Sequence, residues 1–119
     1  MSSEIVNARI SGTSLGIEDH GVMTFFLHLE WPGYGQGLGG FCLDSGKRGT
    51  DERTGWGPGF VAIRKILEVV GVEKWEDLKG KLIRIKVVGW GSSQTPIIGN
   101  ILEDKWLDLQ EFFTSQKDK

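Results

Sequence analysis

Residues 22 to 31 constrain the fold more than any other stretch, because their side chains alternate between two kinds. The even positions are mostly polar, whereas the odd positions are all large and apolar: Met23, Phe25, Leu27, Leu29 and Trp31. Successive side chains of a strand point to opposite faces, so this pattern predicts a strand whose odd face lies in the core. A similar alternation in Lys81 to Val88 predicts a second strand of the same sheet.

One α-helix is predicted, over Pro58 to Val70. Its apolar residues recur at helical spacing: Phe60, Ile63, Ile66, Leu67 and Val70. Proline suits the first turn of a helix, and Gly71 is a natural stop. We expect the apolar faces of the two alternating strands to cover this helix.

The patterns before the helix predict an antiparallel meander. Its first strand runs from Ile5 to Ile10 and continues toward Ile17 past a bulge at Gly12. A hairpin loop at Glu18 to Gly21 leads into the strand of residues 22 to 31. A turn at Pro32 to Gly35 then leads to a third strand from Leu38 to Asp44. Residues 45 to 57 have no periodic apolar pattern and are predicted to form a surface loop.

After the helix, we expect a short helical turn at Trp75 to Leu78 that ends at Gly80, followed by the strand of residues 81 to 88. A last strand is expected from Ile97 to Leu102. The segment from Asp104 to Phe113 should then pack onto the body as a short helix or turn. The 119 residues suffice for one domain, residues 1–119, with 115–119 as a frayed tail. The predicted fold class is α+β: a curved antiparallel sheet of about five strands packed on one α-helix.

Composition excludes several classes of protein. The 14 basic and 16 acidic residues give a net charge of −2, which argues against non-specific nucleic-acid binding. The single cysteine, Cys42, excludes an internal disulfide, and no apolar run approaches the roughly 18 residues of a membrane span. The first residues lack the apolar core of a signal peptide. We therefore expect a soluble cytoplasmic protein.

Glycine is concentrated in residues 33 to 44, which lead into the apolar Phe41 to Leu43. Glycine weakens a strand unless something must come close to its backbone, such as a ligand, another subunit or a crossing strand. The spacing of Gly35, Gly37 and Gly39 superficially resembles a dinucleotide-binding motif. That motif follows a strand and opens a helix, whereas this stretch precedes a strand, so we reject a Rossmann fold.

A candidate anion site is predicted where the glycine-rich strand, the 45–57 loop and the start of the helix converge. Glycines let backbone amides approach an anion, arginine forks fit phosphate, and tryptophan faces stack on bases. The candidate ligand-binding residues are Gln36, Gly37, Gly39, Gly40, Arg48, Arg53, Trp56, Arg64 and Trp90. The alternative, that the arginines are solvated and the tryptophans fill the core, has equal weight.

Catalytic and metal sites have weaker support. Asp19 and His20 could act as acid and base, but they fall in a predicted hairpin tip, and His28 falls on the polar face of its strand. The cysteine and the two histidines lack the spacing of a zinc site, and no hydrolase or P-loop motif is present. We expect no catalytic residue, metal or cofactor, and an enzyme acting on a nucleotide is the least favoured function.

Three segments resemble a family of small bacteriophage and prophage proteins that has no defined function: IVNARISGTSLGIEDHGVMTFFLHLEW, GQGLGGFCLD and FVAIRKILEVVGVEKWEDLKGKLIRIKV. The likeness covers most of residues 4 to 113, and SLGIEDHG and GQGLGG are its most distinctive parts. It supplies no catalytic residue. It implies a phage protein made in the cytoplasm of the infected cell, where small non-enzymatic proteins often counter host defence.

Two main hypotheses follow for function. The first is a non-enzymatic counter-defence protein that binds and sequesters an anionic, nucleotide-type ligand such as an immune second messenger. The alternative is a protein-binding inhibitor or accessory factor that acts on a host defence or replication protein. We also expect a homo-oligomer, because Phe26, Leu82 and Val88 give the second face of the sheet an apolar character.

Overall fold

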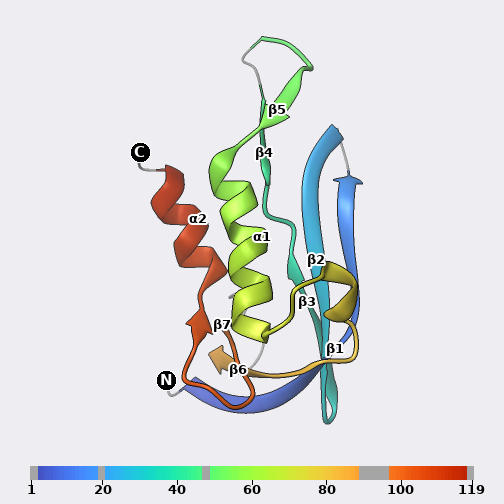
Figure 1. Cartoon of the computed structure of the whole chain (residues 1–119), viewed down its shortest axis with the longest axis vertical. Helices are drawn as coiled ribbons and strands as arrows, with labels where there is room; N and C mark the ends of the chain where they lie inside the picture. Colours follow the sequence, from blue (N-terminus) through green and yellow to red (C-terminus); the bar gives the residue numbers. More distant parts are fainter. Residues whose placement is uncertain (1–2, 19–20, 47–48, 89–96, 118–119) are drawn as a thin grey trace.

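A computed structural model describes residues 3–18, 21–46, 49–88 and 97–117 of the chain. The fold is α+β, as predicted. One antiparallel sheet curls into a half-barrel, and two helices pack against its inner face (Figure 1). None of the helices in the described ranges is long and apolar enough to span a membrane.

The sheet has six strands in the order β3-β2-β1-β6-β7-β8. Their bounds are β1 Ser3–Glu18, β2 Val22–Trp31, β3 Tyr34–Gly39, β6 Leu82–Val88, β7 Ile97–Gly99 and β8 Trp106–Leu107. A separate two-stranded hairpin consists of β4 Asp44–Gly46 and β5 Arg53–Gly55. The helices are α1 Gly57–Val70, the 3-10 turn η2 Trp75–Asp77 and α2 Leu109–Lys117.

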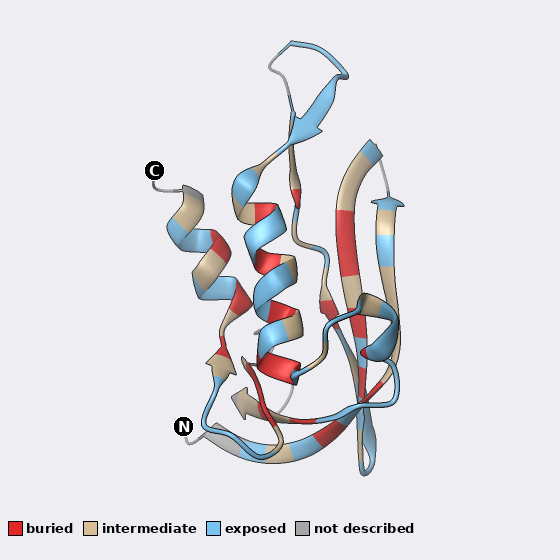
Figure 2. Ribbon diagram, in the orientation of Figure 1, coloured by how far each residue is buried: buried red, intermediate tan, exposed pale blue. Residues whose placement is uncertain are grey.

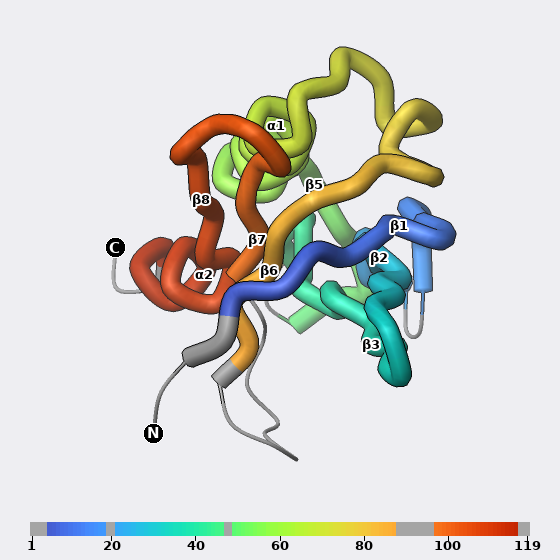
Figure 3. Tube along the Cα trace, turned by 90° about the horizontal axis from the view of Figure 1, so that it is seen from below, coloured from blue at the N-terminus to red at the C-terminus, as the bar shows by residue number. Residues whose placement is uncertain are grey.

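Strand β1 pairs with two different strands along its length. Its first half pairs with β6, up to Arg9 opposite Leu82, and its second half pairs with β2, from Arg9 opposite Glu30 to Glu18 opposite Val22. The register shifts between Ile10 and Gly12, which confirms the predicted bulge. Seen from below, β1 crosses from the β6 side of the sheet to the β2 side (Figure 3).

The core lies between the sheet and the two helices, where the buried residues of both layers face each other (Figure 2). The predicted odd face of β2 is confirmed, because Phe25, Leu27 and Leu29 are fully buried. Ile83 and Ile85 of β6 are buried in the same cluster. On the opposite face of β2, Thr24 is also buried, and its hydroxyl donates a 2.6 Å hydrogen bond to the carbonyl of Phe41.

Helix α1 confirms the predicted helix and its stop. Gly71 adopts a left-handed conformation with φ of 93°, and its amide donates to the carbonyl of Leu67. Near the C-terminus of α1, the side-chain amide of Asn100 donates to the carbonyls of Val69 and Val70, at 2.9 and 3.4 Å. Asn100 thereby joins the end of the helix to the turn after β7.

Three predicted elements differ from the structure. The third strand is Tyr34–Gly39 rather than residues 38 to 44, because its regular pairing with β2 ends at Gly39, and Gly40 has a φ of 82°. The predicted loop of residues 45 to 57 contains most of the β4–β5 hairpin. The last strand ends at Gly99, and the C-terminal segment forms β8 and the nine-residue helix α2. The bounds of β3 and β7 depend on their pairing with other strands of the sheet, which no local pattern contains.

We predict that Gly59→Ala lowers the free energy of unfolding by about 1–3 kcal/mol, the usual cost of overpacking a core. A β-carbon at Gly59 would collide with the carbonyl group of Leu43, so the helix must move away from that segment. Urea unfolding monitored by tryptophan fluorescence measures the effect. Gly57→Ala is the matched control, because a β-carbon there meets no atom within 4 Å. Equal stability of the two variants would contradict this role of Gly59.

Candidate functional site

The positive end of α1 has neither an acidic residue in its first turn nor a side-chain cap. Trp56 occupies the N-cap position without a side-chain hydrogen bond, and the first turn contains no acidic residue. The amides of Gly59 and Phe60 donate to the carbonyl of Trp56, at 3.0 and 3.4 Å. A helix N-terminus attracts negative charge, and here no carboxylate in the first turn offsets this attraction.

The outward face of α1 carries an arginine beside exposed apolar side chains. Phe60 is 66% exposed and Val61 is 41% exposed. Arg64 follows Phe60 by four residues and Val61 by three, so all three side chains share one face of the helix. Arg64 is exposed and makes no ion pair with any other residue in the described ranges. An aromatic ring and a guanidinium are therefore adjacent on a solvent-facing surface.

Trp56 packs partly into the core. Its ring stacks on Phe113 with centroids 6.2 Å apart, and Phe113 in turn stacks on Phe41 at 4.7 Å. The tryptophan is half-buried and packs against the hydrophobic core. Trp56 therefore packs on the core and also lies at the start of α1.

Arg53 is engaged within the protein. Its guanidinium forms an ion pair with the carboxylate of Asp44 across the β4–β5 hairpin and donates a 3.1 Å hydrogen bond to the sulfur of Cys42. The hydrogen bond from Arg53 is the main reason why the pKa of Asp44 lies below its ordinary value. Arg53 stays a candidate ligand-binding residue, but a ligand would have to share it with Asp44.

The glycine-rich strand has a structural explanation at two of its positions. A β-carbon on Gly39 would collide with the carbonyl of Phe25, and Gly40 combines a positive φ with the nearby ring of Phe26. The close approach predicted for this stretch is therefore made at these positions by the neighbouring strand β2. Gln36 and Gly37 lie on the edge strand β3, and a β-carbon at Gly37 would meet nothing within 4 Å.

The candidate residues are only partly brought together. Trp56 is the N-cap residue of α1, Arg64 lies in its second turn, and Arg53 lies on β5, just before the helix. Gln36, Gly37, Gly39 and Gly40 belong to a different part of the fold, along β2. Arg48 and Trp90 fall outside the described residues, as do Asp19 and His20. His28 is exposed on β2.

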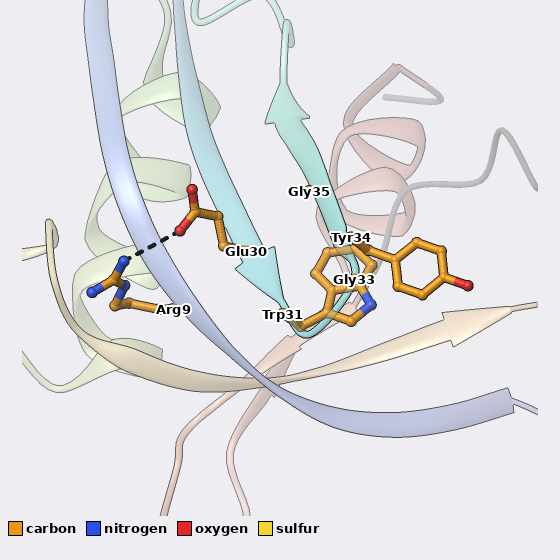
Figure 4. A pocket seen from close by; sticks show the side chains of 6 residues that line it. All are labelled: Arg9, Glu30, Trp31, Gly33, Tyr34 and Gly35. Carbon is orange, nitrogen blue, oxygen red and sulfur yellow. Dashed lines mark hydrogen bonds and ion pairs between the residues drawn. The ribbon is translucent and has the colours of Figure 1, made fainter.

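A shallow open hollow of about 610 Å³ lies at the turn between β2 and β3, where the sequence indicated no site. Arg9 and Glu30 form a 3.3 Å ion pair on one side of it, and Trp31 stacks on Tyr34 at 5.9 Å near the turn (Figure 4). The two pairs leave opposite faces of the hairpin, because Glu30 and Trp31 are consecutive residues of a strand. They do not converge on one ligand.

Among the residues that the structure describes, no three histidine, cysteine or acidic side chains come together as metal ligands. Comparison of the chain with family models, curated proteins and solved structures found no match. The candidate functional site is therefore the exposed first half of α1, defined by its geometry alone.

We predict that Asp44 stabilises the fold in a pH-dependent way. Since the pKa of Asp44 is lowered in the folded protein, its contribution is present above the unfolded pKa of about 4 and is lost as the pH falls through the folded value. Urea unfolding of wild type and Asp44→Asn at a series of pH values measures this contribution. The stability difference between them should be largest near neutral pH and should shrink below about pH 4. A difference that is constant with pH would show that the ion pair does not stabilise the fold.

Proposed function

We propose that the protein is a non-enzymatic binding protein that captures an anionic, nucleotide-type ligand at the start of α1. The observation that carries the proposal is the positive end of this helix, which lacks an acidic residue and a side-chain cap, followed on the same helix by exposed Phe60 and Arg64. Arg64 would pair with a phosphate group, and the helix dipole would add to the attraction. The ring of Phe60 would offer a face on which a base can stack.

The biological role that we propose is sequestration of a nucleotide second messenger of host defence. The support is the resemblance of the SLGIEDHG and GQGLGG segments to phage and prophage proteins, together with the chemistry of the α1 surface. A protein that only binds a messenger lowers its free concentration without turnover. We propose that this takes place in the cytoplasm of the infected cell.

A protein partner is the second candidate, and a specific observation favours it. Phe60 and Val61 place exposed apolar area beside Arg64, and aromatic and arginine side chains are enriched at the centres of protein interfaces. On this alternative, the same helix face would contact a host defence or replication protein.

We predict that Arg64→Ala weakens ligand binding by about 1.5–3 kcal/mol, the usual contribution of a hydrogen bond to a charged group. This corresponds to roughly a 10- to 150-fold rise in Kd. Calorimetric titration with a panel of cyclic nucleotides and ADP-ribose nucleotides measures it. Arg64→Lys should bind with intermediate affinity, because lysine keeps the charge but loses the planar fork. Arg9→Ala is the matched control, because Arg9 is an exposed arginine on the sheet, away from α1.

The outcomes separate the two candidate functions. Saturable heat from the wild type that is lost in Arg64→Ala and kept in Arg9→Ala supports the ligand-binding function. Absence of heat from the wild type for every nucleotide rejects it and favours the protein partner. Equal loss in both arginine variants would indicate general charge attraction rather than a site on α1.

A further inference from the structure

The second half of β1 has a hydrogen-bonded neighbour on one side only. Pairing with β6 extends to Arg9, and the last backbone bonds on that side join Ile10 to Lys81 and Gly80, at 2.9 and 2.6 Å. From Ser11 to Glu18, no described residue bonds to the backbone on this side. In Figure 1 this half of β1 forms the right-hand border of the molecule. It is an open sheet edge.

The pairing of β2 shows which backbone groups face this edge. The carbonyls of Phe25 and Met23 accept hydrogen bonds from Gly40 and Leu43, on the side of β2 away from β1. In an antiparallel pair, the residues opposite them, Leu15 and Ile17, must then turn their own N–H and C=O groups away from β2. Thr13, two residues earlier on the same strand, has the same orientation.

Beyond the bulge between Ile10 and Gly12, the open edge lacks the features by which sheets avoid pairing with other chains. Residues 11 to 17 contain no charged residue and no proline. On the inner face, Leu15 is 37% exposed and Ile17 is 74% exposed. On the outer face the side chains are small, because Gly12, Ser14 and Gly16 occupy the alternate positions. A second strand could therefore approach without displacing a charge or a bulky group.

We propose that two copies of the chain join through this edge, with their β1 strands antiparallel about a twofold axis at Leu15. Leu15 then faces Leu15 of the second copy, and Thr13 faces Ile17 of the second copy. The backbone N–H and C=O groups of Thr13, Leu15 and Ile17 face the open edge. In this register all three residues lie in hydrogen-bonded positions, so each of these groups gains a partner. The two half-barrels become one continuous sheet.

The edge fits a second copy because it is complementary to itself. In this register the apolar Leu15 and Ile17 side chains all lie on one face of the seam, where they cover each other. The acidic Glu18 lies opposite Gly12 of the second copy, so no two like charges meet across the seam. A twofold interface requires such a match of one patch with itself.

Sedimentation velocity over a micromolar to millimolar range tests the assembly. The wild type should form a species of twice the 13.2 kDa chain mass, and Ile17→Lys should raise the Kd of dimerisation at least about tenfold. Ile17 is mostly exposed in the single chain, so the lysine should leave the fold intact, which circular dichroism checks. Leu102→Lys is the matched control, because Leu102 is 89% exposed in the turn between β7 and β8. It should dimerise like the wild type.

Amide hydrogen exchange of the full chain, followed residue by residue, tests the register. The amides of Thr13, Leu15 and Ile17 should become protected as the concentration rises, whereas those of Gly12, Ser14 and Gly16 should be protected at every concentration by β2. A wild type that stays monomeric overturns the proposal. So does a dimer in which the three odd-numbered amides exchange freely, or one that Ile17→Lys leaves unchanged.

Discussion

The fold depends on the hydrogen bonding of β1 with two strands along its length. Strand β1 pairs with β6 at one end and with β2 at the other, and the irregularity between Ile10 and Gly12, which bends the strand, lies at the point where the change occurs. The bend curls the sheet, and the concave side of the curl receives α1 and α2. The position of α1 therefore follows from the course of the first strand.

The elements that the sequence predicts well are those whose cause is local. The alternation of residues 22 to 31 and the stop at Gly71 each require only a few neighbouring residues, and both are confirmed. The sequence did not predict the β4–β5 hairpin, because residues 45 to 57 have no periodic apolar pattern. The ion pair between Asp44 and Arg53 across the hairpin becomes visible only in the fold. Neither the order of the strands nor the half-barrel shape appears in any single window of sequence.

The candidate site shows the same division between local and distant causes. The sequence marks Gly39 and Gly40 as unusual, but the reason is the neighbouring strand β2 and the ring of Phe26, which lie a dozen or more residues earlier in the chain. Arg53 was identified by its residue type, whereas its carboxylate partner emerges only from the fold. The spacing of Arg64 from Phe60 follows from the helix alone. The exposure of Phe60 emerges only from the fold, because the sequence places Phe60 in the apolar pattern of the helix.

The long reach of β1 also sets an order of events during folding. The pairs between β1 and β2 close a short hairpin, whereas Arg9 must wait for Leu82 before the first half of the strand can pair. Contacts between such distant residues form slowly, because a long loop must be closed before any bond is gained. While the chain is being synthesised, the first half of β1 lacks its partner strand until β6 has left the ribosome. During that interval its unpaired backbone is open to a chaperone.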